Sequence, residues 1–142
     1  MGHVRDRSLT EGPARDALVA AAREFNAGRF FEAHEALEEG LDDVPGELWD
    51  LFLGLIQVAV GYHKASQRLW SGAARMLSIG LDKLDPFPSD AGGLRLDELR
   101  CRARADRDAL ARGAFDEGEF RRHPPRLQPL PASLVGGGSA VP

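Results

Sequence analysis

The sequence contains little of what defines several common classes of protein. Its 142 residues include a single cysteine, Cys101, so no internal disulfide can form, as is usual in a reducing compartment. The first residues form no apolar signal stretch, and no apolar segment is long and uninterrupted enough to span a bilayer. We therefore expect a cytoplasmic protein that does not associate with membranes.

Positive charge is also in short supply. Lys and Arg number 18 against 22 Asp and Glu, which gives a formal net charge of -4. Because clustered cationic side chains drive binding to a phosphate backbone, we expect no nucleic-acid partner. The sequence also has no glycine-rich phosphate loop, no nucleophile elbow and no Cys-x-x-Cys pair. Several frequent types of catalytic and cofactor site are thus excluded.

Five segments carry apolar residues at the three- and four-residue spacing of an amphipathic helix. The expected helices cover residues 13–27, 30–40, 48–62, 70–84 and 94–112. The pattern predicts an all-α fold, a small bundle of about five helices, with one domain over residues 13–112. We expect residues 1–12 to be a flexible lead-in, and the Pro- and Gly-rich residues 123–142 to be an extended, then disordered, tail.

Two of these helices have distinct characters. The segment 48–62 is the most apolar, so we expect it to be the central helix, with Asp43 satisfying free amides at its start. The segment 94–112 is rich in arginine, but four acidic residues interleave with the arginines. A solvated face of ion pairs is the expected arrangement there.

An internal repeat supports a hairpin architecture. A shift of forty residues superimposes the apolar positions of 30–41 on those of 70–81, with an aromatic residue at the start and glycine near the end of both. Each copy follows another helix, which predicts two stacked αα-hairpins plus a C-terminal helix. Where the first copy has His34 and Glu38, the second has Ala74 and Ser78. The scaffold therefore does not require an imidazole and a carboxylate at these positions.

His34, Glu38 and His63 form the candidate site. His34 and Glu38 are one helical turn apart on the same face, and antiparallel packing would bring His63 beside His34. Two imidazoles and a carboxylate suit a divalent metal such as zinc or iron. Without a metal, a histidine held by a carboxylate is a general base, and Gln57 would supply an amide donor. A ligand pocket and a purely structural buried hydrogen-bond network remain open alternatives.

A non-catalytic function is the second hypothesis. Glu32, Glu35 and Glu39 lie opposite the apolar stripe of their helix, where we expect them to be exposed. Stacked helical hairpins of the tetratricopeptide kind commonly present grooves to peptides. The alternative is thus a helical interaction module with a protein partner or a second copy of the chain.

Two blocks of sequence resemble a known family. They are Phe25-Asn26-x-Gly28-x-Phe30-Phe31-Glu32-Ala33-His34-Glu35-x-Leu37-Glu38 and Gly54-Leu55-Ile56-Gln57-x-Ala59 with His63, followed by Gly72-Ala73. Over about residues 18–84 the chain resembles the uncharacterised bacterial family DUF309. The resemblance implies a small all-helical protein without an established activity. It marks the same polar positions for testing: Glu32, His34, Glu35, Glu38, Gln57 and His63. The chain departs from the family in lacking a tryptophan near Gly40 and in having Leu69 where asparagine is usual.

Overall fold

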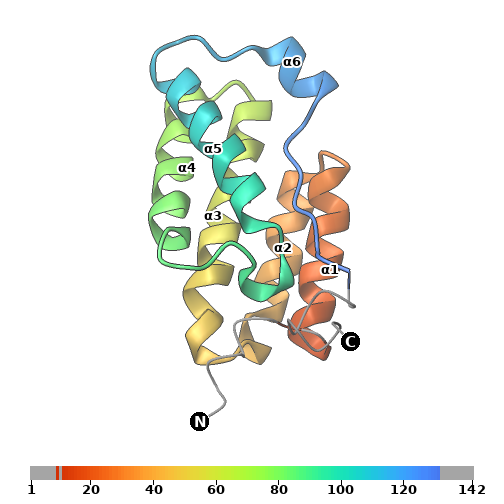
Figure 1. Ribbon diagram of the computed structural model, residues 1–142. Coiled ribbons are helices and arrows are strands. Elements are labelled where there is room, and N and C mark those ends of the chain that lie inside the picture. The colour runs from red at the N-terminus through yellow and green to blue at the C-terminus, as the bar shows by residue number, and fades with distance from the viewer. Residues whose placement is uncertain (1–8, 10, 132–142) are drawn as a thin grey trace.

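The computed structural model describes residue 9 and residues 11–131, which form a bundle of six α-helices without a β-strand in that part of the chain (Figure 1). The helices are α1 (Pro13–Asn26), α2 (Phe30–Gly40), α3 (Trp49–Ser66), α4 (Trp70–Leu84), α5 (Leu96–Ala111) and α6 (Glu117–Arg122). The predicted all-α class is confirmed, with five substantial helices and one short one. None of the helices in the described ranges is both long and apolar enough to cross a membrane.

Helices α1 to α5 pack mainly against their neighbours in sequence, so the bundle is a succession of antiparallel hairpins (Figure 1). α3 lies between α2 and α4, and more than half of its residues are buried. Its side chains pack on both neighbouring helices: Phe52 approaches α2, and Val58 approaches α4. The apolar segment is therefore the central helix, as its composition predicts.

The two hairpin turns are copies of one another. Residues 27–29 and 67–69 form the same backbone hydrogen bonds, forty residues apart, and the residues that precede α2 and α4 have nearly identical dihedral angles. The central residue is left-handed in both turns, with φ of 81° at Gly28 and 63° at Arg68. The structure thus confirms the repeat at the level of the backbone. The second copy tolerates an arginine where a glycine would be unstrained.

Each hairpin is closed by a glycine at the helix contact. A Cβ atom added to Gly40 would lie 2.4 Å from the Cβ of Ala17 on α1. A Cβ atom added to Gly80 would lie 2.8 Å from the carbonyl oxygen of Gly54 on α3. Glycine at the end of each repeat therefore permits close approach of the paired backbones.

The start and end of α3 differ from the sequence prediction. A 3₁₀ turn at Gly46–Leu48 precedes the helix, and Leu48 is its N-cap without a side-chain hydrogen bond, so the predicted cap by Asp43 is wrong. The 3₁₀ turn supplies the backbone geometry that a capping side chain would otherwise stabilise. The helix continues to Ser66, which places His63 inside its last turn rather than beyond its end.

Packing continues beyond the fifth helix. Phe120 of α6 is 6% exposed and joins the core, and the extended residues that follow run back along α1 (Figure 1). Asn26 holds this segment through two hydrogen bonds with the backbone of Leu127, one donated by Nδ2 and one accepted by Oδ1. Most of the predicted lead-in, residues 1–8 and 10, and the tail after Pro131 lie outside the described residues.

The arginine-rich α5 forms the expected ion pairs at its surface, among them Arg102 with Asp106 and Arg104 with Asp85. Arg100 is different, because it is only 6% exposed. Its Nη1 donates hydrogen bonds of 2.8 Å to the carbonyl oxygens of Leu84 and Phe87 at the C-terminal end of α4. One arginine of the predicted solvated face is thus a buried cap for the preceding helix.

Candidate functional site

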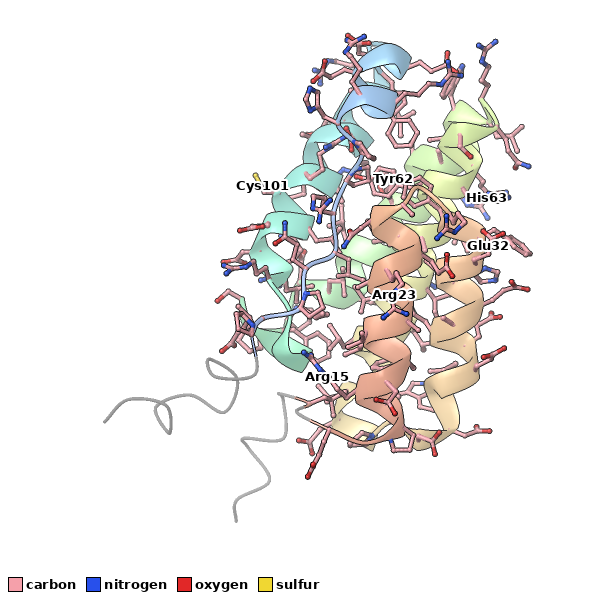
Figure 2. All side chains as sticks on the ribbon, turned by 90° about the vertical axis from the view of Figure 1, so that its right-hand side faces the viewer. Arg15, Arg23, Glu32, Tyr62, His63 and Cys101 are labelled. Atoms are coloured by element: carbon pink, nitrogen blue, oxygen red, sulfur yellow. The ribbon has the colours of Figure 1, made fainter. Side chains whose placement is uncertain are left out.

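Helix α2 places Phe31, His34 and Glu38 on one face, because residues three and four apart on a helix are neighbours. The antiparallel packing of α2 and α3 brings the start of α2 beside the end of α3. The ring centroids of Phe31 and His63 are 5.3 Å apart across this seam. Glu32 and His63 lie on the same side of the bundle, away from Cys101 (Figure 2).

His34 has a defined tautomer. Its Nδ1 lies 2.6 Å from the carbonyl oxygen of Phe31, and since a carbonyl oxygen only accepts, Nδ1 carries the proton. In the neutral ring, Nε2 is then an acceptor, and it lies 3.5 Å from Oε1 of Glu38. Two acceptors therefore face each other at a distance too long for a direct hydrogen bond. A proton, an N–H donor or a cation between them would satisfy both.

The ring of Phe31 contacts both imidazoles. Its centroid lies 4.9 Å from that of His34 and 5.3 Å from that of His63, at interplanar angles of 61° and 50°. The same ring is 45% exposed to solvent. The two histidines thus share one aromatic neighbour at the surface. The signal that identifies Phe31 in the sequence is its position three residues before His34, one helical turn away.

The site is shallower than the helical pattern predicts. The side chain of His34 is 14% exposed, but that of Glu38 is 54% exposed, so only the imidazole is withdrawn into the seam. Glu32, Glu35 and Glu39 are exposed, as the apolar pattern predicts. Gln57 is half-buried, and its carboxamide oxygen is buried without a hydrogen-bond partner among the described residues. Six residues before His63, Gln57 lies about 120° away around the helix and faces a different direction.

The metal hypothesis depends on how His34, Glu38 and His63 are arranged. Within residues 11–131, no group of three or more His, Cys, Asp or Glu side chains is arranged to hold a metal ion. His34 and Glu38 offer two potential metal ligands side by side. His63 lies on the neighbouring helix, where its ring contacts that of Phe31.

The stretch of chain that carries the site is acidic and lies between two basic residues, Arg29 and Lys64. From Phe30 to His63 there is no Lys or Arg, while eight acidic residues occur in the same stretch. They are Glu32, Glu35, Glu38, Glu39, Asp42, Asp43, Glu47 and Asp50. Glu38 and Glu39 lie in the last turn of α2, where the helix dipole is also negative. The field at the site therefore favours a positively charged group.

The fold and this surface define a class: a small all-α protein of stacked helical hairpins with an aromatic, imidazole and carboxylate cluster on its first hairpin. Residues 18–76 match the family model of DUF309, a domain of unknown function, which confirms the resemblance found in the sequence. The match runs from α1 into α4 and includes all the candidate site residues. Helices α5 and α6 lie outside it. No curated protein matches the chain.

Proposed function

We propose that the protein is a binding module, and that the surface formed by Phe31, His34 and Glu38 receives a cationic side chain from a partner protein. The supporting observation is the pair of acceptors, Nε2 of His34 and Oε1 of Glu38, at 3.5 Å beside an exposed aromatic ring. An ammonium or guanidinium group would donate to both acceptors and contact the face of the ring.

The expected binding energies favour a cation that contacts both the aromatic ring and the two acceptors over a cation that contacts only one of them. A cation on an aromatic face contributes about 0.5–2 kcal/mol, depending on how well it is desolvated. An exposed ion pair alone contributes roughly 0–1 kcal/mol. A single exposed aromatic side chain is ordinary on a protein surface. Its meaning here comes from the adjoining carboxylates and from the absence of Lys and Arg between Phe30 and His63.

A labelled hexa-arginine peptide tests the proposal by fluorescence anisotropy at physiological salt. We expect Phe31→Ala to weaken binding by about 5- to 10-fold, because it removes the ring face. Trp49→Ala is the control, since Trp49 is 40% exposed and also lies beside acidic residues. Equal losses in the two variants would show that any exposed aromatic ring near acidic residues binds the peptide and would contradict the proposal.

A second matched pair of variants tests the contribution of the Glu38 carboxylate. Glu38→Gln and Glu39→Gln each remove one charge from the last turn of α2, but only Glu38 faces the imidazole of His34. We expect Glu38→Gln to have the larger effect on peptide affinity, by a factor of three or more, about 0.7 kcal/mol. Equal effects would remove the His34–Glu38 pair from the proposal.

Metal-assisted or acid–base chemistry at His34, Glu38 and His63 is the second candidate function. The observation that favours it is the hydrogen bond from Nδ1 of His34 to a backbone carbonyl, the arrangement that orients metal-binding and basic imidazoles. Zinc titration of untagged protein by calorimetry tests the metal version. It predicts one ion per chain and loss of binding in both His34→Ala and His63→Ala, whereas absence of zinc binding refutes it.

A further inference from the structure

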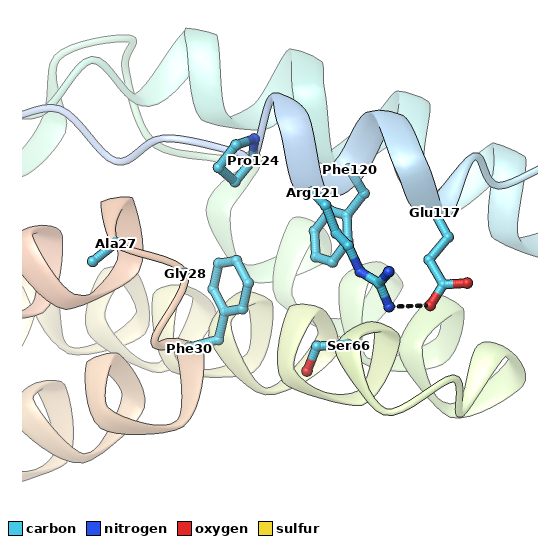
Figure 3. Close-up of a pocket in the computed structure, with 8 residues that line it drawn as sticks. All are labelled: Ala27, Gly28, Phe30, Ser66, Glu117, Phe120, Arg121 and Pro124. Carbon is cyan, nitrogen blue, oxygen red and sulfur yellow. Dashed lines mark hydrogen bonds and ion pairs between the residues drawn. The ribbon is translucent and has the colours of Figure 1, made fainter.

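A cleft of about 250 Å³ lies between the first hairpin turn and α6 (Figure 3), and neither His34 nor Glu38 lines it. Ala27, Gly28 and Phe30 line it from the turn and the start of α2, and Phe120 and Arg121 line it from α6. The cleft thus forms only because α6, outside the DUF309 match, covers the end of the hairpin.

The inner wall of the cleft is apolar. Phe30 and Phe120 are 4% and 6% exposed, and their rings are nearly parallel, with an interplanar angle of 17° and centroids 5.9 Å apart. Gly28 contributes backbone only, and a Cβ atom placed there would meet nothing within 4 Å. The cleft therefore offers two aromatic surfaces and an unobstructed side.

At the mouth of the cleft, the carboxylate of Glu117 is shared by two arginines, of which Arg121 lines the cleft. Oε2 of Glu117 accepts hydrogen bonds from both Arg121, at 2.9 Å, and Arg68, at 2.8 Å. Two guanidinium groups thus share one carboxylate. Arg121 uses Nη2 in this pair, and its remaining N–H donors have no partner among the described residues. An additional anion would accept hydrogen bonds from these donors.

We propose that this cleft binds a small apolar carboxylate, with its apolar part against Phe30 and Phe120 and its carboxylate on Arg121. The cleft volume corresponds to roughly eight water molecules at about 30 Å³ each, so the ligand has about eight to ten non-hydrogen atoms. This is below the range of pockets for drug-sized ligands, about 300–1,000 Å³. A single ring or a six-carbon chain with one carboxylate meets the requirement.

Benzoate and hexanoate are the probes, followed by amide chemical shifts in two-dimensional NMR spectra of the full chain. We expect saturable shifts at Gly28, Ser66 and Arg121, with a dissociation constant of about 0.1–5 mM for a ligand of this size. Tighter binding of benzoate identifies aromatic acids as the preferred ligands, and equal binding identifies apolar acids in general. Absence of saturable shifts at these amides overturns the proposal.

Arg121→Gln and Arg122→Gln form the matched pair for the charge. Both arginines are in α6, are about two-thirds exposed and pair with a glutamate at 2.9–3.0 Å, but only Arg121 lines the cleft. We expect Arg121→Gln to weaken benzoate binding about 5-fold and Arg122→Gln to change it less than 2-fold. Equal weakening by the two variants, or equal affinity for the uncharged benzamide, overturns the recognition of a carboxylate.

A blocking variant tests the location independently of charge. Ala27 is exposed at the cleft, so Ala27→Leu fills it without entering the core, and Ala111→Leu places the same side chain at an exposed position of α5. We expect Ala27→Leu to abolish binding and Ala111→Leu to retain it. Retained binding in Ala27→Leu, with the protein folded by circular dichroism, places the ligand elsewhere and overturns the proposal.

Discussion

Tyr62 should stay protonated well above pH 10 for as long as the protein is folded. Its side chain is fully buried, and its hydroxyl donates a 2.6 Å hydrogen bond to Oδ2 of Asp106, which also accepts from Nε of Arg102 at 2.7 Å. Burial raises the pKa of Tyr62 well above its usual value of 10.0, and the charge and hydrogen bond of Asp106 raise it further. Arg102 opposes the shift only in part.

The sign of the effect on stability follows from proton binding. The folded state holds the phenolic proton more tightly than the unfolded state, so this contribution is complete below pH 10 and is lost as the pH rises from 10 toward the folded-state pKa. At pH 11 the free energy of unfolding should be roughly 1 kcal/mol lower on account of Tyr62 alone, because the unfolded chain is then deprotonated while the folded chain keeps the phenolic proton. At neutral pH, Tyr62→Phe should cost about 1.5–3 kcal/mol, the usual contribution of a hydrogen bond to a charged group.

Tyr62 is the only tyrosine in the chain, so phenolate absorbance at 295 nm reports it alone. We expect no phenolate signal until circular dichroism shows loss of helix, and a smaller alkaline loss of stability in Tyr62→Phe, measured by urea unfolding. The variant keeps every lysine and Cys101, so the difference between the two curves isolates the phenol. A phenolate signal with its midpoint near pH 10 in helical protein would refute the burial and the hydrogen bond together.

Two further substitutions test the packing by urea unfolding. Arg100→Met should cost about 2–4 kcal/mol, because it leaves the buried carbonyls at the end of α4 without a donor, and a cost below about 0.5 kcal/mol would show that these carbonyls are solvated. Gly80→Ala should cost about 1–3 kcal/mol despite the better helix propensity of alanine, since the added methyl group would meet the backbone of α3. Gly46→Ala is its control, because a Cβ atom at Gly46 meets nothing within 4 Å, and equal stability of the two variants would contradict close backbone packing.

The bounds of the two repeat helices, α2 and α4, could be predicted to the residue, because an apolar stripe and a preceding turn define each of them. α2 and α4 carry a regular apolar stripe, and each begins directly after the three-residue turn that contains Gly28 or Arg68. α6 could not be predicted in the same way. It has six residues and one buried side chain, Phe120, so it contains no period from which a helix could be inferred.

Arg100 shows a second limit of sequence patterns. A count of charges along α5 predicts ion pairs, and most of its arginines form them. The partners of Arg100 are mainly backbone carbonyls 13 and 16 residues earlier in the chain. Backbone acceptors have no signature in the sequence, and only the turn between α4 and α5 brings them within reach. The same holds for the candidate site, where spacing predicts the His34–Glu38 pair but not the carbonyl that fixes the tautomer of His34.

The repeat separates what the scaffold needs from what the surface adds. The two hairpins share their turns and their closing glycines, yet the positions of Phe31, His34 and Glu38 in the first correspond to Ser71, Ala74 and Ser78 in the second. Since the second hairpin folds with small side chains there, packing does not explain the aromatic, imidazole and carboxylate groups of the first. Unpaired negative charge at the C-terminal end of α2 costs stability rather than adding to it. A charge pattern that the fold neither requires nor benefits from is best explained by a positively charged partner that compensates it when bound.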